Sequence, residues 1–194
     1  MVKTFSFEKT GLEGLIKICP FISEDGRGCF IKDYAHELFK NNGIELELKE
    51  VFYTYSKKGV VRAIHFQEVK EQAKLVRVIK GKIYDIAVDL RPDSKTFGDW
   101  LGFCLSDENH EELYIPGGFG HGYLVLEDSI VSYKCDEKFY AEHDSGIIWN
   151  DADIDVKWPL ELVENRVIIS DRDKALQSFK EFKAKKENSR KGNK

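Results

Sequence analysis

Between residues 51 and 135 the sequence is a succession of short segments rich in β-branched and aromatic residues, separated by turn residues. Such segments form β-strands, and many of them in regular succession are typical of a sandwich or a barrel. The chain is therefore predicted to be all-β. We expect strands at 51–55, 59–66, 74–79, 82–89, 100–105, 112–115, 122–126 and 130–135.

Two further segments have the pattern of short helices that flank these strands. Residues 34–42 place their apolar side chains on one face and are followed by Gly43, a residue that often ends a helix. After Ser170, apolar residues recur at helical spacing as far as Phe182. We therefore expect one helix before the strands and one after them.

Length and composition indicate a single folded domain. A chain of 194 residues with 42% hydrophobic residues can bury a substantial core, and we assign residues 1–182 to it. The lysine-rich segment 183–194 has no apolar periodicity, so it is expected to be a disordered tail.

Charge and cysteine content restrict the partners and the compartment. A formal net charge of −4 argues against nucleic acid as a partner. No apolar run approaches the roughly 20 residues that a membrane-spanning helix needs. The four cysteines form no C-x-x-C pair, and the N-terminus does not resemble a signal peptide. We therefore expect a reduced, cytoplasmic protein that binds neither nucleic acid nor membrane.

Two chemically active side chains stand in neighbouring predicted strands. His65 lies in GVVRAIHFQ and Lys74 in QAKLVRVIKG, with no carboxylate at ligand spacing between them. In a small barrel, inward-facing residues of adjacent strands converge on one cavity. A histidine can act there as a base near neutral pH, and a lysine can stabilise an oxygen that becomes negative when the adjacent carbon loses a proton. The pair indicates proton abstraction.

A turn later in the chain has the spacing of a known barrel motif. The segment from Pro116 to His121 reads P-x-G-x-x-H, as in the second cupin motif, which supplies one ligand in metal-binding cupins. The first motif usually reads H-x-H followed by a glutamate, whereas this chain has His65, Gln67 and Lys74. A protonated ammonium cannot ligate a metal. We therefore predict a cupin-like jelly-roll barrel, or double-stranded β-helix, in which acid and base chemistry replaces the metal site.

Short segments along most of the chain carry a more specific likeness. They are DGRG at 25–28, RAIHFQ at 62–67, KLVR at 74–77, DIAVDLR at 85–91, TFG at 96–98, IPGGFGHG at 115–122, YK at 133–134, WND at 149–151 and SDRD at 170–173. In these segments the chain resembles the dTDP-4-dehydrorhamnose 3,5-epimerase family. The resemblance implies a homodimeric cupin isomerase of polysaccharide biosynthesis that epimerises a nucleotide-linked 4-keto-6-deoxy sugar without a cofactor.

The resemblance also implies roles for individual residues. His65 would be the base, Asp173 its orienting partner, Lys74 the stabiliser of the enolate and Tyr133 the acid on the opposite face. Because a C4 ketone acidifies the protons at C3 and C5, these groups suffice to invert a centre. The residues implied to hold the substrate are Arg27, Arg62, Gln67, His121 and Lys138.

Two of these assignments depend on local structure. Arg62 and His65 are three residues apart, so strict alternation would place them on opposite faces of a strand. Both can face the cavity only with a β-bulge or at a barrel rim. Asp173 has a second interpretation, because Ser170-x-x-Asp173 is also a capping box at a helix start. The two roles of Asp173 are compatible.

Departures from the family leave the substrate open. Glu50-Val51-Phe52 stands where the family commonly has Gln-x-Asn, and Lys138-Phe139 replaces a pair of tyrosines whose first member stacks on the nucleobase. The substrate could therefore carry GDP or CDP, or be inverted at one carbon only. Other classes also remain: a sugar-nucleotide ketoisomerase, a metal-dependent cupin enzyme such as a dioxygenase, and a non-catalytic sugar-binding cupin.

Overall fold

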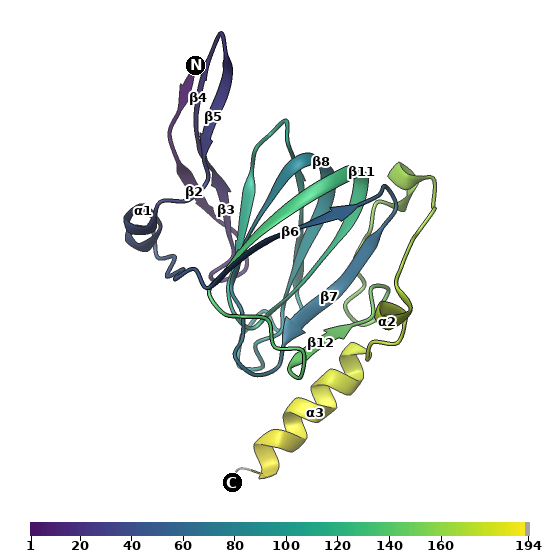
Figure 1. The fold of residues 1–194 in the computed structure, drawn as a ribbon. Coiled ribbons are helices and arrows are strands. Elements are labelled where there is room, and N and C mark those ends of the chain that lie inside the picture. The colour runs from purple at the N-terminus through teal and green to yellow at the C-terminus, as the bar shows by residue number, and fades with distance from the viewer. Residues whose placement is uncertain (193–194) are drawn as a thin grey trace.

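The structure, a computed structural model, describes residues 1–192, and most of these form a β-barrel (Figure 1). The strands are β1 Val2–Lys3, β2 Ser6–Lys9, β3 Ile16–Cys19, β4 Phe21–Asp25, β5 Gly28–Lys32, β6 Glu50–Ser56, β7 Val61–Gln67, β8 Lys74–Asp89, β9 Trp100–Ser106, β10 Glu112–Ile115, β11 Phe119–Cys135 and β12 Asp144–Ile147. The helices are α1 His36–Asn41, α2 Asp171–Lys174 and α3 Phe179–Gly192, with a 3-10 turn at Leu160–Val163.

Within the described residues, one sheet of nine strands makes up the barrel. Seven strands follow the order β12-β7-β11-β8-β10-β3-β2, while β6 pairs with β11 and β9 pairs with β8. The two longest strands, β8 and β11, pair antiparallel along most of their length and form the centre of this sheet. A separate sheet, β1-β4-β5, projects from the barrel as a hairpin with one added strand (Figure 1). The predicted all-β architecture is confirmed.

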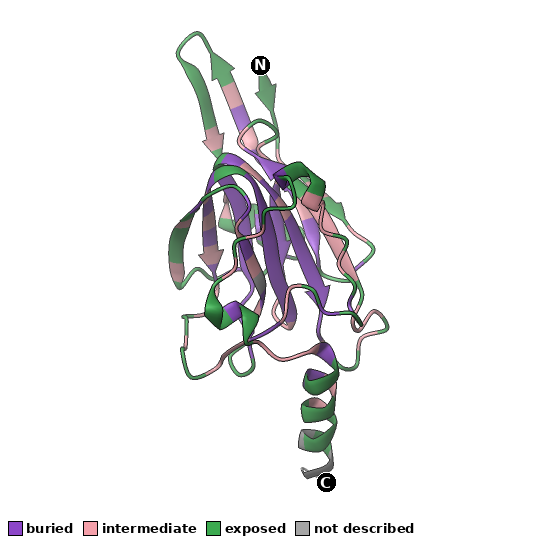
Figure 2. Ribbon diagram, turned by 90° about the vertical axis from the view of Figure 1, so that its right-hand side faces the viewer, coloured by how far each residue is buried: buried purple, intermediate pink, exposed green. Residues whose placement is uncertain are grey.

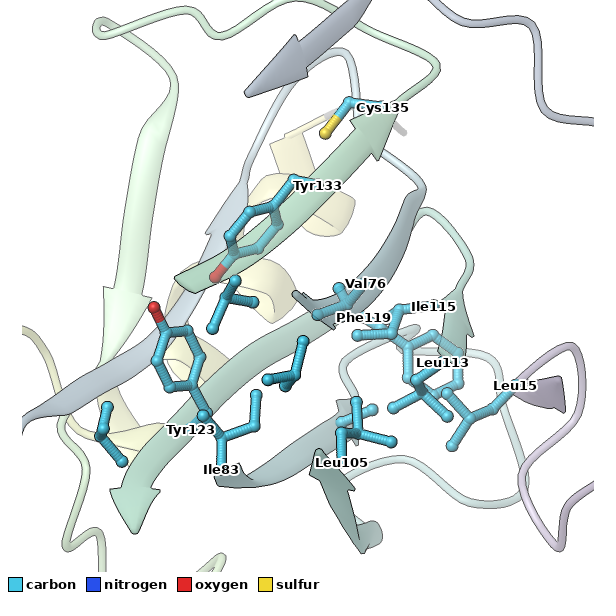
Figure 3. Packing of buried hydrophobic residues seen from close by; sticks show 14 of the residues in the cluster. Leu15, Val76, Ile83, Leu105, Leu113, Ile115, Phe119, Tyr123, Tyr133 and Cys135 are labelled. Atoms are coloured by element: carbon cyan, nitrogen blue, oxygen red, sulfur yellow. The ribbon is translucent and has the colours of Figure 1, made fainter. Parts of the chain in front are cut away.

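Apolar side chains pack on both sides of the central strands. Figure 2 shows buried residues gathered in these strands, whereas the β4–β5 hairpin and most of α3 are largely exposed. Inside the barrel, Val76, Ile83, Val125 and Val131 are fully buried in one cluster, part of which Figure 3 shows from close by. On the outer side of β7 and β8, a second cluster includes the first turn of α3. The start of α3 thereby closes one face of the sheet.

A kink in the middle of β8 changes which of its side chains face inward. Before the kink the even-numbered Val76 belongs to the inner cluster, and after it the odd-numbered Ile83 does. The pairing register against β11 shifts at the same level. Gly81 lies at the kink with φ +83°, and a Cβ there would collide with a carbonyl oxygen of β11. The kink therefore requires glycine, and it reverses the inside and the outside of the strand.

The strands differ from the prediction in two ways. The expected pairs 74–79 with 82–89 and 122–126 with 130–135 are the continuous strands β8 and β11. Gly81 and the polar residues 127–129 resemble turns in the sequence, but the chain continues in extended pairing through them. The N-terminal strands β1 to β5 were not predicted, because each has only two to five residues and so offers little pattern to recognise.

The C-terminal helix also differs from the prediction. α2 ends at Lys174, and Gln177 then pairs with β12, where its carbonyl accepts from the backbone N–H of Ile148 at 3.0 Å. This pairing interrupts the expected helix, which resumes as α3. The segment predicted as a disordered tail is helical as far as Gly192, and residues 193–194 lie outside the described part. None of the described helices is long and apolar enough to span a membrane.

Candidate active site

A cavity of about 500 Å³ opens among β6, β7, β8 and β11. Its wall combines side chains from distant parts of the sequence, because these strands lie side by side in one sheet. The sequence-predicted residues that line it are Arg62, His65, Gln67, Lys74, His121 and Tyr133.

His65 and Asp173 meet at one side of this cavity. The Nε2 atom of His65 lies 3.3 Å from Oδ1 of Asp173, whose side chain is 9% exposed. If Nε2 carries a proton shared with the carboxylate, the Nδ1 lone pair is left to act as a base. The backbone N–H of Asp173 also donates to Ser170 Oγ at 3.0 Å, which caps α2. The predicted contact with His65 and the predicted cap are therefore both present.

A bulge in β7 allows Arg62 and His65 to line the same cavity. On β11, His121 lies opposite His65 and Tyr123 lies opposite Arg62. The paired positions are therefore three residues apart on β7 but only two residues apart on β11. This is the irregularity that the sequence required, and it is confirmed. The guanidinium of Arg62 donates to Ser56 Oγ from two nitrogens, at 3.1 and 3.2 Å, which fixes its position in the wall.

Lys74 lines the cavity from the first half of β8, and Asp85 in the second half contacts the cavity-lining His121. Lys74 and Asp85 are an odd number of residues apart, so only the kink brings both to the inner side. Burial lowers the pKa of Lys74, and the nearby Cys135 and carboxylates oppose that shift only in part. Burial also raises the pKa of Asp85, opposed first by His121, whose Nε2 lies 2.8 Å from Oδ2 of Asp85. This side of the cavity is thus a desolvated region in which Lys74 lies near the Asp85–His121 pair.

Tyr133 stands in the second half of β11 between three aromatic rings. Its ring stacks on Phe52 with centroids 4.8 Å apart and planes at 14°, and the edge of His121 approaches at 5.8 Å. Its hydroxyl points toward that of Tyr123, as Figure 3 shows, and Tyr123 is bonded to Thr54 Oγ1 at 2.9 Å. Burial raises the pKa of Tyr133 well above 10, so the phenol stays protonated.

Gln67 lines the cavity, but its side-chain amide is already hydrogen-bonded to backbone groups. Its Nε2 donates to the carbonyl oxygens of Lys70 and Lys138 at 2.9 and 3.1 Å, and its Oε1 accepts from the N–H of Tyr140 at 2.6 Å. Gln67 therefore holds the loop after β11. In that loop the exposed Lys138 does not line the cavity, whereas Phe139, which is 54% exposed, does.

Arg27 lies outside the cavity of its own chain. It sits at the tip of the β4–β5 hairpin, where its side chain is 91% exposed and forms an ion pair with Asp25 at 2.6 Å. The structure of one chain therefore does not bring Arg27 to the other predicted site residues.

Several lining residues were missed in the sequence. Arg172, from the SDRD segment, faces the cavity and forms an ion pair with Asp144 of β12. Asp85, from the DIAVDLR segment, interacts with the cavity-lining His121. Both occur in segments that carried the family likeness, which was the available signal. Phe52 was noted only as part of a departure from the family, and Tyr123 gave no signal, because aromatic residues in strands usually pack in a core.

The described residues contain no group of three or more His, Cys, Asp or Glu side chains arranged to hold a metal ion. The cavity-lining His65 and His121 are instead each paired with a carboxylate, that of Asp173 and that of Asp85. Together with the buried ammonium and the buried phenol, this arrangement can remove a proton, stabilise the resulting anion and supply a proton from another wall.

Comparisons with known proteins agree with this geometry. Residues 9–181 match the sequence model of a family described as dTDP-4-dehydrorhamnose 3,5-epimerase. A protein of that name from Methanothermobacter thermautotrophicus is 48% identical over 178 residues, which cover 91% of this chain and 96% of the relative.

Solved structures show the same fold. The dTDP-4-dehydrorhamnose 3,5-epimerase of Bacillus anthracis, with TDP and PPi bound, has a TM-score of 0.85 and 37% identity, covering 91% of this chain and all of that one. The 3,5-epimerase of Legionella pneumophila, in complex with dTDP-4-keto-L-rhamnose, has a TM-score of 0.86 and 33% identity, covering 90% and 93%. The expected cupin-like barrel is thereby confirmed.

Proposed function

The chain belongs to the dTDP-4-dehydrorhamnose 3,5-epimerase family and is a nucleotide-sugar isomerase. From this premise we propose that it inverts C3 and C5 of a dTDP-linked 4-keto-6-deoxy sugar, with His65 removing a proton from each carbon and Tyr133 delivering one to the opposite face. The observation that carries the proposal is the placement of an Asp-paired imidazole and a buried, protonated phenol in different walls of one cavity. Neither group needs a metal or an organic cofactor for this chemistry.

The proposed reaction uses the acidity that a ketone gives to its neighbouring carbons. His65, held by Asp173, takes the proton from C3 or C5, and the electrons move to the C4 oxygen. The buried ammonium of Lys74 stabilises that enolate oxygen, because a cation in a desolvated site interacts strongly with new negative charge. Tyr133 then delivers its proton to the opposite face of the carbon, and the centre is inverted.

The remaining lining residues suit the nucleotide part of the substrate. Two guanidinium groups, from Arg62 and Arg172, face the cavity and can grip diphosphate oxygens. The exposed ring of Phe139 offers a stacking surface for a nucleobase, while Gln67 and Lys138 contribute through the loop that carries this ring. The pair His121–Asp85 is available to the sugar oxygens. Base stacking alone does not select thymine, so GDP- and CDP-linked sugars belong in the test.

The proposed activity is tested by incubating the protein in D₂O with dTDP-, GDP- and CDP-linked 4-keto-6-deoxy sugars. With the dTDP sugar we expect deuterium at both C3 and C5 and an inverted product at both centres, followed by NMR. Deuterium at a single carbon would show that the protein inverts only one centre. Absence of exchange with every sugar would contradict the proposal.

Tyr133→Phe separates proton removal from inversion. The variant keeps the ring that stacks on Phe52 but lacks the proton donor. His65 should still remove protons and return deuterons to the same face, so we expect deuterium incorporation with little inverted product at one or both carbons. NMR of the recovered sugar measures both quantities. Inversion of both centres at the wild-type rate would show that another acid or water reprotonates the enolate.

The oligomeric state is proposed to be a homodimer. Val51, Tyr53 and Tyr55 of β6 are each more than 60% exposed on the side away from the cavity, and Phe30 of the projecting hairpin is 59% exposed. Exposed apolar groups of this size mark association surfaces. In such a dimer, the hairpin of one copy could carry Arg27 to the substrate of the other copy.

Tyr53→Glu combined with Tyr55→Glu is expected to convert this dimer to monomers. Light scattering should give twice the chain mass of 22.4 kDa for the wild type and a single chain mass for the variant. A glutamate at Leu38, which is an exposed residue of α1, serves as the control and should leave the mass unchanged. A wild type with the mass of one chain would contradict the dimer.

A further inference from the structure

The enolate in this cavity has two possible fates. If His65 returns the proton to the face from which it came, the sugar is unchanged. If Tyr133 delivers a proton to the other face, the centre is inverted. The inference below rests on the proposed function, because it concerns what determines the choice between these two outcomes.

Phe52 is the side chain that most directly fixes the phenol of Tyr133. The two residues lie opposite each other in the antiparallel pair of β6 and β11, and their rings stack in an offset, nearly parallel arrangement with centroids 4.8 Å apart. Phe52 also lines the cavity and is 39% exposed. It therefore covers one face of the Tyr133 ring on the side open to the cavity, while Tyr133 itself is only 6% exposed.

The remaining contacts of Tyr133 leave the plane of its ring to be set by this stack. The plane of the His121 ring is inclined at 71° to that of Tyr133, and its Nε2 is engaged by Asp85. Tyr123 faces the hydroxyl and is anchored to Thr54. Neither of these contacts lies flat against the ring. Removal of the Phe52 ring would free one face of the phenol and admit water beside it.

A second observation comes from the sequence. Phe52 belongs to the Glu50-Val51-Phe52 stretch that departs from the family pattern, so an apolar ring stands where a polar amide is common. The first and last residues of this stretch, Glu50 and Phe52, each contact a residue that lines the cavity. The carboxylate of Glu50 accepts from the backbone N–H of Phe139 at 3.1 Å, and Phe52 stacks on Tyr133.

We propose that Phe52 is a positioning residue that sets the ratio of inversion to exchange, by holding the phenol of Tyr133 in the orientation that reaches the enolate carbon. Phe52 takes no part in bond making. Its effect passes entirely through Tyr133, because a misplaced acid loses the competition with His65 for the same carbon. A displacement of about 1 Å can cost a reacting group up to 10²-fold in rate.

The test is a series of substitutions at position 52, assayed in D₂O with the dTDP-linked sugar. For Phe52→Ala and Phe52→Leu we expect inversion to fall about 10- to 100-fold relative to deuterium exchange. Phe52→Tyr keeps a stacking ring and should recover most of the ratio. The ratio is internal to each sample, so a partial loss of folded protein does not change it.

A double-mutant cycle provides the control. Adding Phe52→Ala to Tyr133→Phe should cause no further loss of inversion, because the acid through which Phe52 acts is already absent. An unchanged ratio with a raised KM for Phe52→Ala would overturn the proposal and make Phe52 a substrate contact, as would a full additional loss in the double variant. A wild type that exchanges and inverts no sugar would instead overturn the proposed function on which this inference rests.

Discussion

His65→Asn is expected to lose deuterium exchange at both C3 and C5 by about 10²- to 10⁴-fold, the usual contribution of a general base. Asparagine has a similar size and can still bond to Asp173, so the cavity wall is largely kept. Binding of dTDP, measured by calorimetry, should remain because the diphosphate is assigned to other residues. Exchange rates from NMR in D₂O give the main result.

Asp173→Asn is the matched comparison for that experiment. The carboxylate only orients and polarises the imidazole, so a smaller loss of exchange is expected than for His65→Asn. Exchange by His65→Asn at close to the wild-type rate would make the histidine structural and remove the base from the mechanism. An equal loss for both variants would mean that the pair acts as one unit.

Lys74→Met is expected to reduce kcat by about 10²- to 10³-fold, the effect of one lost donor to an oxyanion. Methionine keeps the length of the side chain but cannot stabilise the enolate oxygen. Deuterium exchange should fall with kcat, because the enolate itself becomes less stable, and this distinguishes Lys74 from Tyr133. Unchanged turnover would show that the enolate is stabilised by another group.

The same variant should be more stable than the wild type. Burial lowers the pKa of Lys74 below 10.5, so protonating this lysine costs more free energy in the folded state than in the unfolded state. Methionine removes that cost, and each kcal/mol gained raises the melting temperature of a chain of this size by about 2–4 °C. The difference should shrink as the pH rises toward 10.5, because the wild-type lysine then loses its charge. Thermal melts at pH 7 and pH 10 measure it.

The barrel could be predicted because its strands carry a strong local signal. β6, β7, β9 and β10 coincide within a few residues with the expected segments, since β-branched and aromatic residues alternate there with little ambiguity. The hairpin β4–β5 escaped prediction because its residues are mostly exposed and show no buried face. α3 escaped prediction beyond Phe182 because residues 183–188 are mostly exposed and lack the apolar spacing on which a prediction depends.

Local patterns in the sequence suggested His65, Lys74 and His121, and the other site residues depended on the family likeness. The contact of His65 with Asp173 could be expected only from that likeness, because more than a hundred residues separate them in the sequence. Lys138 and Arg27 show the limit, because sequence position does not tell whether a side chain faces the cavity, the solvent or another copy. Asp85 shows another limit, since simple alternation from Lys74 places it on the wrong face.

Because of the kink at Gly81, the number of residues in this part of β8 decides which of its side chains face the cavity. A single residue gained or lost between positions 79 and 82 would turn one half of β8 over, so that Asp85 would no longer face His121 and Tyr84 would face inward instead. Hydrophobicity and strand propensity would hardly change, yet the chemistry would be lost. In this short stretch the number of residues is as strictly constrained as the identity of any residue that meets the substrate.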